Sequence, residues 1–304
     1  MTAPTFPIPP YPQHRPVRPI PPSIKVRYNR PMTVCIAAVC SDGSGKPCIV
    51  LCSDTRLDLG DIGSTSTAIK LDVLGHGWCV QMAGGWSNVC HWKDHLKRRV
   101  QTAKEANLEQ ISRCLKESAE YFSKSAFCES DTTYELLLSG FPVGNPVILS
   151  ASLRPSTNGG HSLSTAMSGT FACIGSGNLV ASTLLSAREC HSSMSIEYVS
   201  YLVYEAKRIS EKTGAVGNMT VLMLHSQGAE ETPDRAQVGC LSKDGEAHLE
   251  AAFRGIWKVP FVTFPDFPAE FFTNPTEIQR LQSTIADPSR QQPSPESPAK
   301  SDES

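Results

Sequence analysis

The residue of greatest chemical interest is a threonine that directly follows a methionine, at the start of the apolar run Met32-Thr33-Val34-Cys35-Ile36-Ala37-Ala38. If the bond between Met32 and Thr33 were cut, Thr33 would carry a free α-amino group beside its own hydroxyl. Such a residue holds both the nucleophile and the base of an acyl-transfer reaction. The plainer interpretation is that Thr33 only begins a β-strand, where threonine is common.

Three further groups of residues stand where apolar runs end or are interrupted. Asp54-Thr55-Arg56 follows the apolar run 49–53, and Lys70 is the single cation in the apolar segment 68–71. A buried carboxylate or ammonium is costly unless it is paired. Asp54, Arg56 and Lys70 are therefore each expected to have a partner. Met82-Ala83-Gly84-Gly85 ends the next run, and its glycines permit a close approach of the backbone to a ligand.

The elements that must position these residues begin with hairpins. Apolar runs joined by turn-rich segments predict that 34–40 pairs with 49–53, 68–73 with 78–83, and 134–141 with 146–153. Short strands are predicted at 170–175, 219–224 and 261–264, and polar loops at 59–67 and 154–169.

Helices alternate with these groups of strands. Apolar residues at three- and four-residue spacing predict helices over 86–104, 107–127, 179–190 and 194–212, the last with Ser195 as its N-cap. The order of strands, two helices, strands, two helices and strands favours an α+β fold, in which two stacked antiparallel sheets are covered on each side by a helix pair. A generic α+β arrangement satisfies the same periodicity.

The spacing of these residues resembles that of proteasome β subunits, which are N-terminal-nucleophile hydrolases. Thr33 heads a strand, Asp42-Gly43 lies in the hairpin turn, and Asp54-Thr55-Arg56 follows the second strand. Lys70 stands sixteen residues after Asp54, and Ala83-Gly84 begins thirteen residues after Lys70. The register requires about five extra residues in the first hairpin, near 44–48, compared with that family.

The resemblance resumes at Ile174-Gly175-Ser176-Gly177 and at Gly217-Asn218-Met219-Thr220-Val221, and it covers roughly residues 33–225. The opening Met-Thr-x-Cys-x-Ala is also similar to the bacterial proteasome-like proteins called Anbu. The resemblance implies the four-layer αββα sandwich of the N-terminal-nucleophile hydrolases. It also implies a threonine-type endopeptidase that needs no cofactor or metal, and a homo-oligomeric ring or helical stack that acts on peptides or unfolded proteins.

The resemblance also implies a role for each matched residue. Thr33 would attack the peptide carbonyl, Lys70 would lower the pKa of the Thr33 hydroxyl, and Asp54 would hold Lys70. The backbone N–H of Gly84 would donate to the oxyanion. Ser176 would form a hydrogen bond near the α-amino group.

Three positions complete the implied site. Met82 and Asp58 fall where the family lines the pocket for the residue before the cut bond. At the end of the last predicted helix the family has an aspartate and, three residues later, a serine; here Ser210, Glu211 and Thr213 stand nearest. Thr213 is the expected replacement for the serine hydroxyl, whereas the aspartate has no direct counterpart.

Composition limits the remaining possibilities. The chain has 304 residues, of which 40% are hydrophobic and 19% charged, with a net charge of −2. We expect a globular, cytoplasmic protein, because no apolar run approaches the roughly 20 residues of a membrane helix and no signal-peptide core is present. The near-neutral net charge does not indicate binding to nucleic acid or to a membrane surface. The eleven cysteines form no CxxC pair and are expected to be reduced core residues.

The two ends of the chain are expected to differ from the domain at 33–265. Residues 1–32 form a proline-rich leader or pro-segment, since ten of the 23 prolines lie there, and residues 266–304 form a tail rich in proline, serine and charge. Both segments are expected to be disordered. Thr33 would become N-terminal either by removal of residues 1–32 or by translation from Met32.

Alternative functions remain open. One is a catalytically inactive assembly subunit of the same fold, and another is a small-molecule amidase that uses the same chemistry. The segment Gly175-Ser176-Gly177 lacks the third glycine of a nucleotide loop. His91 and His95 are spaced to share one helix face, where a solvated surface is favoured over a metal site.

Overall fold

The computed structural model describes residues 33–58, 64–65, 68–105, 107–157, 160–213, 216–227 and 237–256. The predicted leader at 1–32, the tail at 266–304 and the strand expected at 261–264 lie outside the described residues. The side chains of residues 57, 58, 64, 65, 237 and 256 are also outside the description.

The first sheet has five antiparallel strands in the order β10-β1-β2-β11-β12. They are β1 (Cys35–Ser41), β2 (Pro47–Asp54), β10 (Phe171–Ile174), β11 (Thr220–Ser226) and β12 (Gln237–Cys240). The predicted first hairpin is confirmed, because β1 pairs with β2 from Cys35 opposite Ser53 to Ser41 opposite Pro47. The strand that contains Asp54 therefore lies directly beside the strand that follows Thr33.

The second sheet also has five antiparallel strands, in the order β5-β6-β7-β8-β9. They are β5 (Leu71–Gly75), β6 (Trp78–Ala83), β7 (Tyr134–Gly140), β8 (Val147–Pro155) and β9 (His161–Ser168). Both predicted hairpins in this sheet are confirmed. Two short strands, β3 (Leu57–Asp58) and β4 (Ser64–Thr65), pair separately, and a 3-10 turn covers Pro142–Gly144.

Five α-helices complete the described fold: α1 (Trp86–Thr102), α2 (Leu108–Ser123), α3 (Asn178–Ala187), α4 (Ile196–Glu211) and α5 (Lys243–Ile256). The side chain of Asn107 accepts a hydrogen bond from the backbone of Gln110 and caps α2. Ser195 caps α4 in the same way, as predicted. These caps satisfy backbone donors that a helix start leaves without partners. None of the described helices has both the length and the apolarity needed to cross a membrane.

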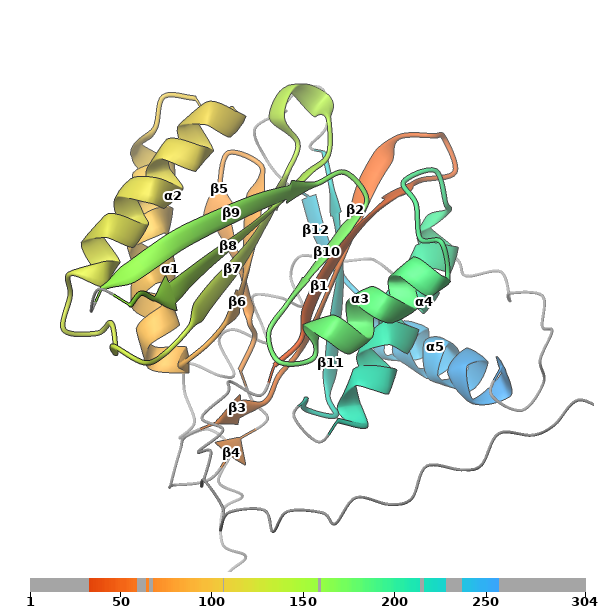
Figure 1. The fold of residues 1–304 in the computed structure, drawn as a ribbon. Helices are drawn as coiled ribbons and strands as arrows, with labels where there is room; N and C mark the ends of the chain where they lie inside the picture. Colours follow the sequence, from red (N-terminus) through yellow and green to blue (C-terminus); the bar gives the residue numbers. More distant parts are fainter. Residues whose placement is uncertain are drawn as a thin grey trace, which may run out of the picture.

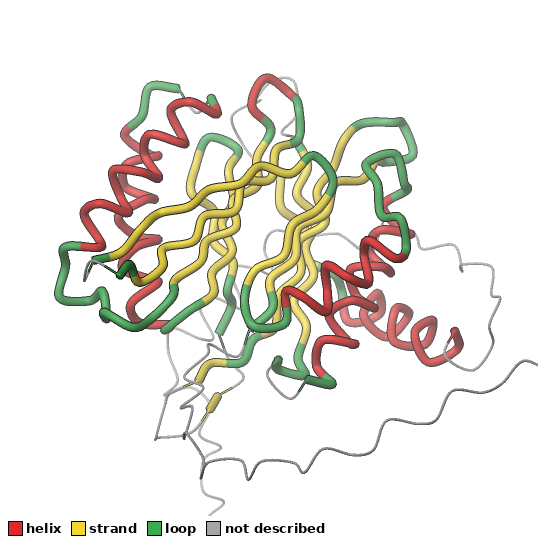
Figure 2. The backbone as a smooth tube through the Cα atoms, viewed as in Figure 1, coloured by secondary structure: helices red, strands yellow, loops and turns green. Residues whose placement is uncertain are grey.

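The elements form four layers, with the two sheets face to face and helices on both outer sides (Figures 1 and 2). One buried cluster fills the space between the second sheet and the helices α1 and α2, and a second lies between the first sheet and the helices α3, α4 and α5. A third cluster, which includes Cys35, Leu51 and Leu137, lies between the sheets. The expected α+β class with two stacked antiparallel sheets is thus observed.

The structure corrects the predicted loop at 154–169. Residues 161–168 form the edge strand β9, which pairs with β8 from Ile148 opposite Ser168 to Pro155 opposite His161. Five of its eight side chains are polar, so the segment looks like a loop in the sequence, yet its backbone completes the ladder of β8. The strand β12 and the helix α5 were not predicted at all.

Candidate active site

Thr33 lies just before β1, with only 3% of its surface exposed. Its carbonyl oxygen accepts hydrogen bonds from the backbone of Gly177 at 3.1 Å and from the hydroxyl of Ser176 at 3.2 Å. Its nitrogen donates to the same Ser176 hydroxyl at 3.1 Å. The turn at 175–177 directly follows β10, and β10 pairs with β1. This pairing brings the turn to Thr33, and the turn holds the Thr33 backbone.

Lys70 reaches Thr33 from the other sheet. It stands just before β5, its side chain is 2% exposed, and its Nζ contacts Thr33 Oγ1. The same Nζ donates to Asp54 Oδ1 at 2.9 Å. The carbonyl of Lys70 accepts from the backbone of Met82 at 3.0 Å, so the end of β6 holds the lysine in place. The prediction that Lys70 pairs with Asp54 is confirmed.

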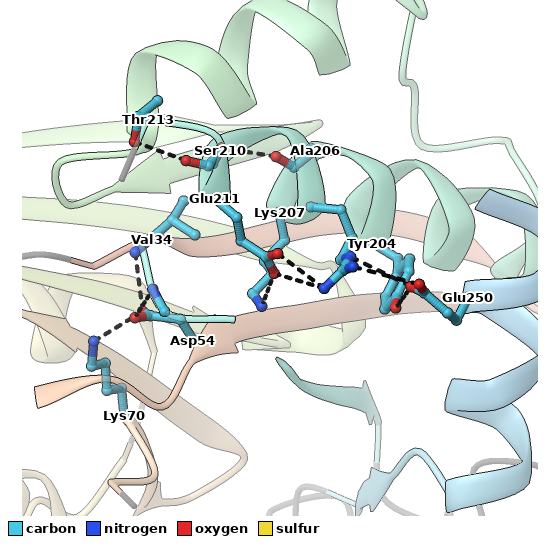
Figure 3. A network of polar contacts seen from close by, with 12 residues as sticks. Val34, Asp54, Lys70, Tyr204, Ala206, Lys207, Ser210, Glu211, Thr213 and Glu250 are labelled. Carbon is cyan, nitrogen blue, oxygen red and sulfur yellow. Dashed lines mark hydrogen bonds and ion pairs between the residues drawn. The ribbon is translucent and has the colours of Figure 1, made fainter. Parts of the chain in front are cut away.

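Asp54 is the last residue of β2 and is completely buried. Besides Lys70, its Oδ1 accepts from the backbone of Val34 at 3.1 Å, and its Oδ2 accepts from the backbone of Gly217 at 3.0 Å. Figure 3 shows the side chain of Lys70 and the nitrogen of Val34 converging on this carboxylate. Both oxygens have donors, which is the condition under which a buried ion pair is tolerated.

Glycine is required in the turn that carries Ser176. Gly175 has a φ of +88°, and a Cβ placed there would lie 2.4 Å from the carbonyl oxygen of Thr33. The N–H of Gly175 donates to Glu135 Oε2 at 2.8 Å. Glu135 lies on β7 opposite Ala83 of β6, so this carboxylate links the second sheet to the Ser176 turn.

Glu135 was not among the predicted site residues. A weak signal exists, because Glu135 is the only charged residue in the apolar strand Tyr134–Gly140. A charge inside such a strand usually has a partner. The identity of that partner, a backbone N–H forty residues away, is not visible in the sequence.

Gly84 directly follows β6 and has a φ of +130°, which favours glycine. A Cβ there would lie 3.1 Å from the carbonyl oxygen of Thr133. The neighbouring backbone is close to the Thr33 segment, since the thiol of Cys35 donates to the carbonyl of Met82 at 3.4 Å. This places Gly84 near the site, and its role as an oxyanion donor stays a prediction.

The two predicted pocket residues have different outcomes. The side chain of Met82 is 3% exposed and packs in the cluster beneath α1 and α2. The side chain of Asp58 lies outside the description, although its backbone forms part of β3. A role for either residue in binding substrate stays a prediction.

At the end of α4, Ser210 reaches the Ser176 turn. Its hydroxyl donates to the carbonyl of Ala206 at 2.8 Å and lies 3.3 Å from the carbonyl oxygen of Gly177. The hydroxyl of Thr213 donates to the carbonyl of Ser210 at 2.8 Å, and its predicted catalytic role stays a prediction. Glu211 pairs with Lys207 and with Arg208, which precede it on the same helix. Figure 3 shows the contact between Glu211 and Lys207.

This arrangement is suited to the activation of a hydroxyl group. The ammonium of Lys70 touches the Thr33 hydroxyl in a buried setting, where a nearby positive charge favours the alkoxide over the alcohol. In the 304-residue chain the nitrogen of Thr33 is a peptide nitrogen bonded to Met32, and such a nitrogen has no basic lone pair. Cleavage of that bond would supply the missing base. Among the described residues, no three His, Cys, Asp or Glu side chains are grouped as metal ligands.

Comparisons with known proteins do not assign this geometry to a family. The chain matches no protein-family model, and it matches no curated protein. The arrangement of Thr33, Lys70, Asp54 and Ser176 is therefore the basis for assigning a function.

Proposed function

We propose that this chain is a threonine-type peptidase of the proteasome β-like class, with the N-terminal-nucleophile hydrolase fold and Thr33 as its nucleophile. The observation that carries the proposal is the position of Lys70 Nζ, which contacts both Thr33 Oγ1 and Asp54 Oδ1 in a buried site. The four layers and the fixed Thr33 backbone support it. The segment from 1 to 32 is then a leader whose removal completes the site.

In the proposed reaction, the free α-amino group of Thr33 takes the proton of its own hydroxyl as Oγ1 attacks the substrate carbonyl. A terminal amine titrates at about 7.7–8.0, close enough to neutral pH to accept and return a proton. The N–H of Gly84 stabilises the oxyanion, and Lys70 stabilises the developing alkoxide. The tetrahedral intermediate collapses to an ester on Thr33 and releases the amine product. Water then hydrolyses the ester and restores the threonine.

The direct test uses a chain that starts at Met32, so that removal of the initiator methionine exposes Thr33. Intact-mass measurement establishes the N-terminal residue, and a panel of fluorogenic peptides measures hydrolysis. We expect Thr33→Ala to lower the rate by roughly 10³-fold or more, because the nucleophile is lost, whereas Thr33→Ser retains part of it. Thr183→Ala, at an exposed position on α3, serves as the control. Unchanged hydrolysis by the Thr33→Ala protein would refute the proposal.

One contact favours a second candidate, a non-catalytic assembly subunit of the same fold. The side chain from α4 that approaches the Gly177 carbonyl is the neutral hydroxyl of Ser210, where the resemblance leads us to expect an aspartate. The two candidates differ in the mature chain. Material from the native cell that begins at Thr33 supports the peptidase, whereas a stable chain that retains residues 1–32 supports the subunit.

The proposed class carries an expectation about assembly. Peptides or unfolded proteins would be the substrates, and copies of the chain would form a ring or helical stack around the active sites. Size-exclusion chromatography with light scattering tests this for the chain that starts at Met32. A monomer with full activity would contradict the assembly while leaving the chemistry of Thr33 intact.

A further inference from the structure

The eleven cysteines are all free thiols, and they differ in their access to solvent. Eight are buried, and three are partly exposed: Cys90, Cys128 and Cys173. Burial raises the pKa of Cys90 to about 11 and that of Cys173 to about 12. These two thiols are therefore poor nucleophiles near neutral pH, because the thiolate is the reactive form.

Cys128 differs from the other two by having an imidazole partner. Its Sγ lies 3.4 Å from Nδ1 of His161, on the edge strand β9. The other ring nitrogen, Nε2, lies 3.1 Å from the carbonyl oxygen of Thr132. A carbonyl can only accept, so Nε2 carries the hydrogen and Nδ1 presents its lone pair to the thiol. The thiol of Cys128 is thus the donor, and His161 is placed as its base.

His161 also forms part of the wall of a cleft between α2 and the strands β8 and β9. The cleft has a volume of about 480 Å³ and is lined on the helix side by Lys116, Glu120 and Ser123, and on the sheet side by Leu163 and His161. It lies on the helix-covered side of the second sheet. The Thr33 site instead uses the end of the first sheet, so the two sites are separate.

We propose that Cys128 and His161 form a second reactive site, in which the partly exposed thiol of Cys128 exchanges with small disulfides. In the first step the Cys128 proton moves to His161 Nδ1 while Sγ attacks one sulfur of the disulfide. The S–S bond of the reagent breaks, and the departing thiolate takes the proton from Nδ1. The products are a mixed disulfide on Cys128 and one free thiol, so the small disulfide is the only oxidant consumed.

The groups around the pair set its resting state. Burial and the carboxylate of Glu129 both raise the pKa of Cys128, which keeps it a neutral thiol until a base removes the proton. The ring of Tyr134 is 6.2 Å from that of His161, and Lys116 and Glu120, which carry opposite charges, line the same cleft as His161. Reactivity therefore depends on His161 as a general base, and not on a preformed thiolate.

The experiment treats the full chain with glutathione disulfide and follows each cysteine by peptide mass spectrometry. We expect Cys128 to form the mixed disulfide about tenfold or more faster than Cys90 and Cys173, since general-base assistance typically contributes at least that much. His161→Gln keeps a donor for the Thr132 carbonyl but offers no base, and it should lower the Cys128 rate about tenfold. His191→Gln, an exposed surface change, should leave the rate unaltered.

The pH profile of the unmodified chain gives a readout that does not depend on any variant. With His161 as the base, the Cys128 rate should rise less than tenfold per pH unit, because the thiol reacts without first becoming a free thiolate. A rate that rises tenfold per pH unit throughout would overturn the proposal. Equal rates at the three partly exposed cysteines, or an unchanged Cys128 rate in His161→Gln, would also overturn it. If His161→Gln loosens the fold, Cys90 and Cys173 accelerate as well, and the pH profile then decides.

Discussion

The side chain of Lys70 shows how one buried cation can serve both stability and chemistry. It is 2% exposed and lies between a carboxylate and a hydroxyl. Asp54 holds the charge in the interior through its two backbone donors and Lys70 itself. Because Asp54 is its counter-charge, the ammonium contacts the Thr33 hydroxyl without the cost of an isolated buried charge.

At the scale of single residues, we predict that Asp54→Asn strongly destabilises the fold. The substitution keeps the shape of the side chain but leaves the Lys70 ammonium buried without a counter-charge, which typically costs about 3–5 kcal/mol. Asp72→Asn is the matched control, because Asp72 also pairs with lysines, Lys93 and Lys97, but is 20% exposed. Asp72→Asn should lower the free energy of unfolding by about 1 kcal/mol or less.

Urea unfolding of both variants, followed by circular dichroism, measures the difference in the free energy of unfolding. A combined Asp54→Asn and Lys70→Met protein should recover much of the lost stability, because no unpaired charge remains. Equal losses in Asp54→Asn and Asp72→Asn would show that burial of the Asp54–Lys70 pair has no special energetic weight.

At the scale of elements, the turn from Gly175 to Gly177 joins the two sheets at the site. Its backbone and Ser176 hold the Thr33 carbonyl, and Glu135 holds the turn from the second sheet. The strand β10, which leads into this turn, pairs with β1 and so carries the turn to Thr33. Glu135 is therefore a positioning residue, which acts on Thr33 through Ser176.

We predict that Glu135→Ala lowers the stability by about 2 kcal/mol, the usual worth of a hydrogen bond to a charged acceptor. In the chain that starts at Met32, it should also lower kcat for peptide hydrolysis more than it raises KM, because the Ser176 turn loses its support. Glu135→Gln keeps an acceptor for the Gly175 N–H and should restore most of both quantities. Glu109→Ala removes a carboxylate that is 84% exposed and is the control.

Peptide hydrolysis and thermal unfolding, measured on the same preparations, separate the two effects. A Glu135→Ala protein that loses stability but keeps its kcat would show that the carboxylate supports the fold alone. In that case the Ser176 turn is held by Gly177 and Ser210 without help from the second sheet.

At the scale of the whole molecule, His225 joins the two sheets from within. It is completely buried on β11, and its ring lies 3.1 Å from the hydroxyl of Ser139 on β7 and 3.1 Å from the carbonyl oxygen of Gly77. The carbonyl accepts from Nε2–H, so Nδ1 accepts from Ser139. Phe141 meets the ring edge-on at a centroid distance of 5.0 Å. Protonation would place a charge in the layer between the sheets.

We predict that the packing of the two sheets weakens in acid because of His225. Burial lowers its pKa from 6.5 to about 4. The unfolded chain therefore takes up a proton below about pH 6.5, while the folded chain does so only near pH 4. The contribution of neutral His225 to the free energy of unfolding is present in full above pH 6.5 and is lost as the pH falls from 6.5 to 4. The total loss is about 3 kcal/mol.

Urea titrations across this pH range measure the slope of the unfolding free energy. His225→Gln should be less stable at neutral pH. The slope of its unfolding free energy with pH should be smaller by the amount that corresponds to the uptake of about one proton on unfolding. His191→Gln, on the exposed turn before α4, should keep the slope of the parent chain. An unchanged slope in His225→Gln would assign the acid sensitivity to other groups.

Much of the fold could be predicted because its strands and helices carry strong local patterns. The apolar runs of β1, β2, β6 and β7, the turns between them and the cap at Ser195 are local features. The strand β9 could not be predicted in the same way, because its polar side chains belong to an edge strand whose ladder is supplied by β8. The thiol–imidazole contact of Cys128 likewise depends on that edge strand.

The sequence by itself determined that Thr33 and Asp54 stand at the ends of apolar runs and that Lys70 interrupts one, where buried charges need partners. Only the tertiary structure decided which atoms meet, because the stacking of the two sheets brings Lys70 to Thr33 and carries Glu135 to the Ser176 turn. Local patterns set which face of each strand is buried. The contacts across the two sheets depend on their relative placement, which arises from the packing of the whole core.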